Sequence, residues 1–448
     1  MKNAFHAYDI RGVYNKDFNK EDVYKIGFFI PQLLETNEVI VGRDGRNSSP
    51  EIHDALLRGI TDAGADVYDI GLSTTPMVYF ATANYGFKAG VQITASHNPK
   101  EYNGLKISRT NALPVGYDSG LDKLEKLATE GVIKVSEKKG KVIEKNIRKD
   151  YIDFQQKYLK DFSNLKVGVD VSNGAASVII KDIWKDNFLY INDNLDGNFP
   201  AHSPNPLMEE NTQQIRDLVK EKNLDLGLVF DGDADRVVFS DDKGRHVKPD
   251  LIIAVMAQYF LSGDKPKGLV LEDIRTSKSV GEYVEKFSGK MAMWKVGRAN
   301  AAPKLREIDG IYGGEFAGHY YFKDFFYSDS GILAASIVLG IVADLKKQGK
   351  KFSDLIDEIT HYYNSGEINF KLEDKKGAME RVKKFFVEKE KPTAFYDFDG
   401  YRVEYKDWWF NIRMSNTEPY LRLLCEAKTL DMLEDKVSVI TKLIKNEQ

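Results

Sequence analysis

Cysteine is almost missing from this chain, because Cys425 is the only one among 448 residues. A single cysteine excludes an intrachain disulfide, and its place in the apolar run 421–425 predicts a core residue rather than a reactive thiol. Long apolar segments are missing too. The longest run, 331–343, is too short for a membrane span and predicts a buried helix, and the first residues lack the apolar stretch of a secretion signal. We therefore expect a soluble cytoplasmic protein with no membrane partner.

The chain also has no excess of positive charge. Its 64 Lys and Arg residues face 68 Asp and Glu residues, which gives a net charge of −4 and a pI near 6.1. Nucleic-acid-binding proteins usually carry a basic balance, so no nucleic-acid partner is expected. Apolar residues at 42% and charged residues at 29% are ordinary for a globular protein with several cores.

Strand-like and helix-like segments alternate over most of the chain, which indicates α/β layers with largely parallel sheets. Length alone suggests about three domains. The alternation runs in three rounds, with strands expected at 38–41, 66–70, 89–94, 166–171, 188–191, 224–230, 268–271, 291–296 and 310–312. The last eighty residues instead combine clustered strands with two flanking helices, which favours a small α+β domain. We predict three similar mixed α/β domains, 1–148, 149–248 and 249–364, and a smaller C-terminal α+β domain, 365–448.

The most informative motif is an acidic loop between two apolar strands. Asp231, Asp233 and Asp235 alternate within five residues, Arg236 follows, and Gly232 is expected to allow the bend. Three like charges this close are costly without a cation, and carboxylates are ligands that suit magnesium. The alternative is a solvated acidic hairpin tip.

A second motif places Ser96 in the loop Thr-Ala-Ser-His-Asn-Pro, after a strand. A serine hydroxyl is a weak nucleophile, so it needs help from its surroundings. His97 or Lys106 can supply a proton acceptor or a positive charge. The alternative is a turn without chemistry, and no Ser-His-Asp triad is predicted, because the nucleophile-elbow pattern is absent.

Two further loops carry binding groups. Glu315 stands on a glycine-flanked loop, where one carboxylate can accept hydrogen bonds from paired sugar hydroxyls, and His319 follows it. The stretch 413–419 collects a guanidinium, hydroxyls, an amide and backbone N–H groups, which is the inventory of a phosphate site. Taken alone, each of these two motifs could also be a polar turn without a binding role. Because the four loops occur in order, one in each predicted domain, we expect them to face a central cleft.

These motifs, with the segment Ala-Tyr-Asp-Ile-Arg-Gly at 7–12, resemble the α-D-phosphohexomutase superfamily, and most closely its phosphomannomutase/phosphoglucomutase branch. The resemblance spans nearly the whole chain. It implies that Ser96 carries a phosphoryl group and, together with Asp231, Asp233 and Asp235, holds Mg²⁺. The expected reaction moves phosphate between O6 and O1 of mannose, and also of glucose, through a bisphosphorylated sugar, with hexose 1,6-bisphosphate as activator. The partners are then small hexose phosphates, and the protein is a monomer or a homodimer.

The resemblance also assigns the other site residues. Those expected near the transferring group are Arg11, His97, Lys106, Arg236 and His319, with Lys106 as the first candidate for general acid or base. Those expected to bind substrate are Tyr8, Arg275, Arg298, Glu315, Ala317, His319, Arg413, Ser415, Asn416 and Thr417.

Two positions depart from the family pattern. Arg298 stands where many relatives place histidine, and arginine binds phosphate but cannot shuttle protons at neutral pH. Ala317 stands where relatives often have serine, so one sugar-contacting hydroxyl is missing.

Three alternatives stay open: a phosphoglucosamine mutase, a metal-dependent sugar phosphohydrolase, and a phosphosugar-binding protein without turnover. Tyr102 and the aromatic segment 320–324 favour the phosphomannomutase branch over the first of these.

Overall fold

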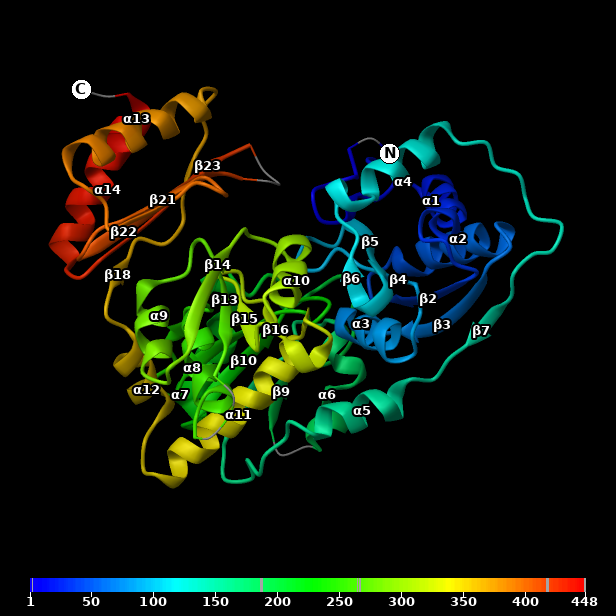
Figure 1. Ribbon diagram of the computed structural model, residues 1–448. Helices are drawn as coiled ribbons and strands as arrows, with labels where there is room; N and C mark the ends of the chain where they lie inside the picture. The colour runs from blue at the N-terminus through cyan, green and yellow to red at the C-terminus, as the bar shows by residue number, and fades with distance from the viewer. Residues whose placement is uncertain (2, 186–187, 264, 266, 416–418, 447–448) are drawn as a thin grey trace.

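The computed structural model describes residues 1, 3–185, 188–263, 265, 267–415 and 419–446. In these residues the strands form four sheets, each built from one consecutive stretch of sequence. We call the parts around the four sheets domains I to IV, in chain order. Domains I and IV lie at opposite ends of the molecule, with domains II and III between them (Figure 1).

Domain I holds a sheet with the order β1-β5-β4-β2-β3-β7, and β6 pairs with β5. Its strands are β1 (Ile10–Val13), β2 (Glu38–Arg43), β3 (Asp66–Leu72), β4 (Ala89–Ile93), β5 (Tyr102–Arg109), β6 (Leu113–Pro114) and β7 (Val142–Glu144). Its helices are α1 (Lys20–Leu33), α2 (Ser49–Asp62), α3 (Thr75–Asn84) and α4 (Leu121–Glu130).

Domains II and III hold five-stranded sheets with the orders β12-β11-β10-β8-β9 and β14-β13-β15-β16-β17. The strands of domain II are β8 (Val167–Asp170), β9 (Leu189–Ile191), β10 (Leu226–Phe230), β11 (Val237–Asp241) and β12 (His246–Val247), and its helices are α5 (Arg148–Gln156), α6 (Ile180–Trp184) and α7 (Gln213–Lys222). The strands of domain III are β13 (Leu269–Asp273), β14 (Lys290–Trp294), β15 (Tyr312–Gly314), β16 (Tyr320–Phe322) and β17 (Ser328–Asp329). Its helices are α8 (Leu251–Phe260), α9 (Lys278–Glu285), α10 (Arg298–Glu307), α11 (Gly331–Lys347) and α12 (Phe352–Ile359).

Domain IV is an antiparallel sheet with two helices, as the α+β prediction expects. Its strands are β18 (Tyr363–Asn364), β19 (Ile368–Phe370), β20 (Ala394–Tyr396), β21 (Tyr401–Glu404), β22 (Trp408–Met414) and β23 (Leu421–Ala427), and its helices are α13 (Lys375–Lys389) and α14 (Leu430–Lys445). Cys425 has no exposed surface, which confirms its prediction as a core residue.

Domains I, II and III share one strand order. In domain I the strands of this pattern are counted from β2, because β1 lies at the edge of the sheet and pairs antiparallel with β5. In each domain the first strand then pairs in parallel with the second and the third, and the third pairs antiparallel with the fourth. The similarity of the three domains is therefore confirmed. The expectation of largely parallel sheets was wrong, because the third strand returns through a short hairpin rather than through a crossover helix.

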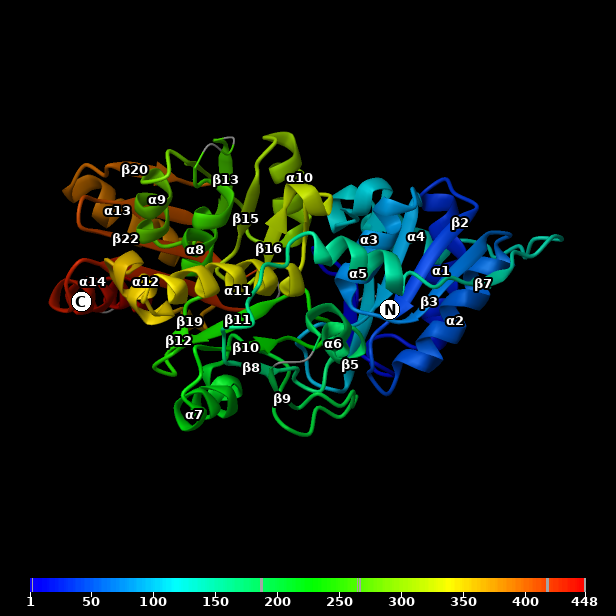
Figure 2. The ribbon, with the colours of Figure 1, turned by 90° about the horizontal axis from the view of Figure 1, so that it is seen from below.

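The long helix α11 ties domains II and III together. It runs between their sheets (Figure 2), and its apolar side chains are buried on nearly all sides. Such a helix cannot form at a surface, so the apolar run is explained by packing in the protein interior. In the described part of the chain, no helix is both long and apolar enough to cross a bilayer.

An irregular loop follows β9, and His202 holds it to the end of β8. Its ring nitrogens face two acceptors: Nδ1 lies 2.8 Å from the Ser203 carbonyl oxygen and Nε2 lies 3.0 Å from Asp170 Oδ2. Both nitrogens must carry a proton to donate. Burial lowers the pKa of His202, but the hydrogen bond and charge of Asp170 outweigh it and hold this pKa above its ordinary value.

We expect this histidine to make stability depend on pH. Because its folded-state pKa is raised, its contribution is complete below the unfolded pKa of about 6.5 and is lost as pH rises through the folded pKa. His202→Gln should therefore lower the free energy of unfolding by about 1–3 kcal/mol at pH 6 and by less at pH 9, measured by urea denaturation. Equal losses at both pH values would contradict a charged His202.

Candidate active site

The shared strand order brings three of the predicted loops to equivalent places. Each follows the third strand of its domain and leads into the fourth: Ser96 follows β4, Asp231 follows β10 and Glu315 follows β15. A loop at the carboxyl end of a parallel strand is where α/β proteins commonly bind ligands. The fold therefore presents a hydroxyl, a carboxylate cluster and a further carboxylate from one topological position.

Ser96 and the acidic loop are in direct contact. Ser96 Oγ donates a hydrogen bond of 2.8 Å to Asp231 Oδ2, although 135 residues separate them. Ser96 has no exposed surface and a φ of +51°, a strained conformation for a residue with a side chain. Its backbone N–H donates to Thr94 Oγ1, which helps to hold this turn.

The three aspartates form one buried cluster. Ligand oxygens of Asp231, Asp233 and Asp235 lie within 4.8 Å of one another, and none of the three residues is exposed. This burial excludes the solvated hairpin tip. The bend is made at Ala234, which has a φ of +61°, and not at Gly232 as expected. Gly232 serves a different need, because a Cβ atom there would lie 2.5 Å from the Ser96 carbonyl oxygen.

The aspartate cluster fits a metal ion. Among the described residues, Asp233 Oδ1 and Asp235 Oδ1 are buried without a hydrogen-bond partner. Buried carboxylate oxygens left unpaired are costly, whereas a divalent cation with oxygen ligands would satisfy them. Burial raises the pKa of Asp231 well above its ordinary value, and the charges of Asp233 and Asp235 raise it further.

Several cationic groups surround the cluster. Lys106 Nζ lies 2.7 Å from Asp233 Oδ2 and 2.5 Å from Asp235 Oδ2. Burial opposes the charge of Lys106, but the two carboxylates hold its pKa well above the ordinary value. Arg236 Nε lies 3.7 Å from Asp231 Oδ2, and Arg11 donates to Asn98 Oδ1 at 2.7 Å. The Arg11 contact joins it to the serine loop.

His97 lies beside the nucleophile candidate. Its Nδ1 is 3.4 Å from Ser96 Oγ. Burial lowers the pKa of His97 well below its ordinary value, and the nearby charges of Arg236, Arg11 and Lys106 lower it further. The imidazole is therefore neutral at neutral pH.

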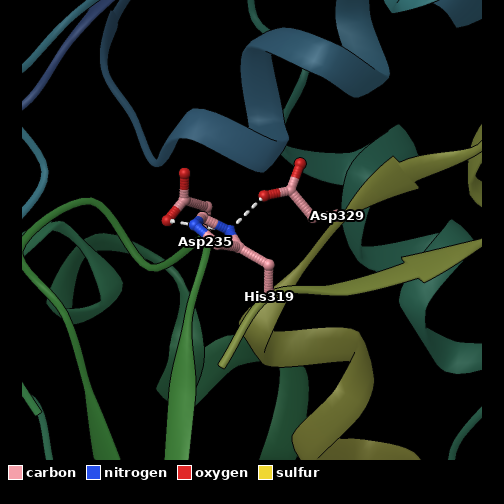
Figure 3. Close-up of side chains that lie close together, drawn as sticks. All are labelled: Asp235, His319 and Asp329. Carbon is pink, nitrogen blue, oxygen red and sulfur yellow. Dashed lines mark hydrogen bonds and ion pairs between the residues drawn. The ribbon is translucent and has the colours of Figure 1, made fainter. Parts of the chain in front are cut away.

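His319 connects the acidic loop to domain III. Figure 3 shows its ring between two carboxylates, with Nδ1 2.7 Å from Asp329 Oδ2 and 3.8 Å from Asp235 Oδ1. Asp329 is fully buried on β17 and also accepts a hydrogen bond of 3.0 Å from Arg298 Nε. Asp329 thus contacts both His319 and Arg298.

Glu315 is held from two sides. Its Oε1 accepts from the Tyr321 hydroxyl at 2.5 Å and its Oε2 accepts from the Gly297 N–H at 3.0 Å. Arg275 lies 4.0 Å from the same carboxylate and is paired with Asp273 at 2.8 Å. Each carboxylate oxygen keeps a lone pair for a further donor. Ala317 lies two residues further along this loop and is partly exposed.

Arg298 and Tyr8 lie at the seam between domains I and III. The Arg298 guanidinium donates to the Ala112 carbonyl oxygen at 2.8 Å and stacks 3.7 Å from the centroid of the Tyr79 ring. The Tyr8 hydroxyl donates to the Val296 carbonyl oxygen at 3.0 Å. In this structure, both side chains join domain III to domain I.

The fourth loop is linked to the others through domain III. Arg413 Nε donates to Asp399 Oδ1 at 3.2 Å, and Asp399 Oδ2 accepts from the Val296 N–H at 3.0 Å. Ser415 N–H donates to the Tyr420 carbonyl oxygen. The predicted residues Asn416 and Thr417 lie outside the described residues. A chain of contacts thus runs from Ser96 through the aspartates, His319 and the Glu315 loop to Arg413.

Comparison with known proteins agrees with this arrangement. Four family models match successive parts of the chain: the phosphoglucomutase/phosphomannomutase alpha/beta/alpha domains I, II and III at 2–146, 148–244 and 248–363, and the C-terminal domain of the same family at 367–440. A phosphomannomutase of Escherichia coli is 36% identical, with 99% of each chain covered. The chain belongs to the phosphoglucomutase/phosphomannomutase family.

Other relatives agree with that assignment. A phosphomannomutase of Methanocaldococcus jannaschii is 36% identical over 98% of this chain and 97% of its own. The crystal structure of a phosphoglucomutase/phosphomannomutase family protein from Burkholderia thailandensis superposes with a TM-score of 0.88 at 27% identity, covering 99% of this chain and 98% of that one. The chain is therefore a phosphohexose mutase, which is an isomerase.

Sequence reasoning missed three residues of this phosphohexomutase. Thr75 Oγ1 donates to Asp233 Oδ2 at 2.5 Å, Asp329 holds His319, and Arg46 holds the serine loop. No local signal marks Thr75 or Asp329. Arg46 had a signal, because Asp-x-Arg follows the first strand in both domain I and domain III, at 44–46 and 273–275.

Proposed function

We propose that this phosphohexomutase moves a phosphoryl group between O6 and O1 of mannose, and also of glucose, through phosphorylated Ser96 and a bisphosphorylated sugar. The observation that carries the proposal is the 2.8 Å contact between Ser96 Oγ and Asp231. A phosphate ester on Ser96 would add negative charge next to three buried carboxylates. That arrangement requires a cation, and the unpaired oxygens of Asp233 and Asp235 favour one.

The proposed reaction has two halves. In the first, the bond between phosphorus and Ser96 Oγ breaks while a bond forms to the free O1 or O6 oxygen of a hexose monophosphate, and the proton of that hydroxyl is passed by a proton-transfer group of the site to the released Ser96 Oγ. In the second, the other phosphate of the bisphosphate returns to Ser96 Oγ. When Mg²⁺ is bound by Asp231, Asp233 and Asp235, it supplies positive charge that offsets the charge of the transferring group.

The chain's own groups take the remaining roles. Lys106 is our first candidate for proton transfer, and His97, with Nδ1 3.4 Å from Ser96 Oγ, is the second. Arg11 and Arg236 add positive charge around the same point, and His319 lies beside it. The groups proposed to hold the sugar and its distal phosphate are Tyr8, Arg275, Arg298, Glu315, Ala317, Arg413, Ser415, Asn416 and Thr417.

The test is a set of parallel assays on purified protein with Mg²⁺ and a trace of hexose 1,6-bisphosphate, which phosphorylates any unmodified Ser96. Mannose 1-phosphate should be converted to mannose 6-phosphate, and glucose 1-phosphate should react as well. Faster turnover of glucosamine phosphate would favour the phosphoglucosamine mutase alternative. Release of inorganic phosphate that outpaces isomerisation would favour a phosphohydrolase, and binding without any conversion would overturn the proposal.

Glu315→Gln should weaken sugar binding. The substitution keeps the shape of the side chain and removes its charge, and a hydrogen bond to a charged group contributes about 1.5–3 kcal/mol, or roughly 10- to 100-fold in kcat/KM. Steady-state kinetics on mannose 1-phosphate would measure the loss. Glu307, an exposed residue of domain III, provides the matched control Glu307→Gln, which should leave kcat/KM unchanged. Unchanged kinetics in Glu315→Gln would remove Glu315 from the site.

A further inference from the structure

Arg46 uses every N–H group of its guanidinium inside the serine loop of domain I or on its own neighbour. Its Nη2 donates to the carbonyl oxygens of Ser96 and Asn98 at 2.8 and 2.7 Å. Its Nη1 donates to those of Pro99 and Tyr102 at 2.7 and 3.1 Å. An arginine has five such donors, and the fifth, Nε–H, points to Asp44 Oδ2 at 3.2 Å.

Arg46 is itself held rigidly. It is 1% exposed, and Asp44 Oδ1 accepts from its backbone N–H at 3.0 Å, so one carboxylate fixes both its main chain and its side chain. Ser49 Oγ donates to the same carboxylate at 2.6 Å. Four carbonyl groups within seven residues of loop are therefore tied to one immobile group. The position of the Ser96 backbone depends directly on that group.

The irregular loop that follows β9 in domain II covers the guanidinium of Arg46. The Phe199 ring lies over Arg46, with 5.0 Å between the guanidinium carbon and the ring centroid. Phe199 has a φ of +50°, which is uncommon for a bulky residue and costs about 1 kcal/mol or more. This loop is bound to the rest of domain II through Asn173, whose carbonyl oxygen accepts a hydrogen bond from the Asp196 N–H at 3.0 Å. Strain retained at this contact indicates that the surrounding structure requires the ring there.

In domains II and III, residues at the end of the first strand make equivalent contacts to the loop that follows the third strand. In domain II, Ser172 follows the first strand, and its hydroxyl donates at 2.6 Å to the carbonyl oxygen of Phe230, the residue just before Asp231. In domain III, Asp273 accepts at 2.8 Å from the N–H of Phe316, the residue just after Glu315. Three times, the end of the first strand holds the loop that follows the third strand.

We propose that Arg46 is a positioning residue for phosphoryl transfer. It holds the backbone of the serine loop so that Ser96 Oγ stays aligned with the aspartate cluster, and Phe199 keeps the guanidinium in place from domain II. The inference rests on the proposed function, in which Ser96 carries the phosphoryl group. Small displacements of a reacting atom lower the rate of transfer more than they lower binding, because binding uses other groups.

Arg46→Lys provides the test. Lysine keeps the positive charge but has three donors at one atom, so it cannot serve four carbonyl groups. The enzyme is loaded with a radiolabelled phosphoryl group from hexose 1,6-bisphosphate and then mixed rapidly with mannose 1-phosphate. The rate constant of transfer per labelled Ser96 should fall on the order of 100-fold, with little change in the KM of mannose 1-phosphate.

Phe199→Asn is the second variant, chosen in case Arg46→Lys does not fold. Asparagine accepts a positive φ, so the variant removes the ring and also relieves the strain. Its transfer rate should fall by up to about 10-fold, the scale of a cation–π contact, while its unfolding temperature changes little. Arg381→Met is the matched control, because Arg381 donates to the Leu443 and Ile444 carbonyl oxygens in domain IV, outside the contact chain. It should lose stability and keep the transfer rate.

Three outcomes decide the question. A lower rate constant per labelled enzyme in both test variants supports the proposal. Wild-type rate constants in both variants, with the loss confined to the amount of enzyme that folds or accepts label, would make Arg46 a purely structural residue and overturn it. Failure of the wild-type enzyme to accept the label or to transfer it would instead contradict the proposed function, and the proposed role of Arg46 would then be contradicted too.

Discussion

Replacing Ser96 by alanine should remove mutase activity almost completely. The substitution deletes the oxygen that we propose forms the bond to phosphorus, and loss of a nucleophile costs on the order of 10⁴-fold or more in kcat. The fold should survive, because the change removes one buried hydroxyl whose partner is Asp231. The measurements are kcat for mannose 1-phosphate and the amount of radiolabel retained from hexose 1,6-bisphosphate.

Both readouts are needed. Ser96→Ala should retain no label, whereas Ser136→Ala, which changes an exposed serine hydroxyl of the same domain, should retain label and activity. Residual turnover at the wild-type rate, or label on the Ser96→Ala protein, would place the phosphoryl group on another residue. The proposed chemistry would then be lost, although the family assignment would stand.

Removal of the divalent cation should have the second-largest effect. Dialysis against a chelator should lower kcat by about three orders of magnitude, because a metal ion contributes several kcal/mol to the stabilisation of transition-state charge. Added Mg²⁺ should restore the rate. Full activity after exhaustive chelation would show that the aspartate cluster works without an ion.

A physical readout checks the ligands independently of turnover. Mg²⁺ should raise the unfolding temperature of the wild-type protein, because a ligand that binds only the folded state stabilises it. Asp233→Asn should weaken that response, since it removes one charge from the cluster, whereas Asp118→Asn, at an exposed position of a short 3₁₀ helix in domain I, should not. An identical response in the Asp233→Asn protein would mean that the ion binds elsewhere.

Local patterns were enough to place the motifs on elements. Apolar runs bounded by turn residues gave the strands that precede Ser96, Asp231 and Glu315, and the two helices expected to flank the C-terminal strands are present as α13 and α14. Such patterns are short-range, because they depend on which residues alternate or repeat along one element. The sheet pairings were less predictable, since the same run of apolar residues suits a parallel or an antiparallel neighbour.

The support around the site escaped sequence reasoning for a related reason. Thr75 acts on Asp233, which is 158 residues away, and only the packing of domain I against domain II brings the two together. Asp329 lies ten residues from His319, and the antiparallel pairing of β16 with β17 brings their strands together. Arg298 shows the same limit. Its residue type suited a phosphate ligand, but its guanidinium meets Asp329, Tyr79 and a domain I carbonyl group in the folded chain.

The backbones of the acidic loop and the serine loop lie so close together that they affect how variants of this enzyme should be interpreted. Gly232 has no functional group, yet a methyl group there would collide with the main chain of Ser96. Damage at such a position would look like a chemical defect, although no reacting atom had been altered. At Gly232, tolerance to substitution therefore depends on the space between two backbones and not on the chemistry of the side chain.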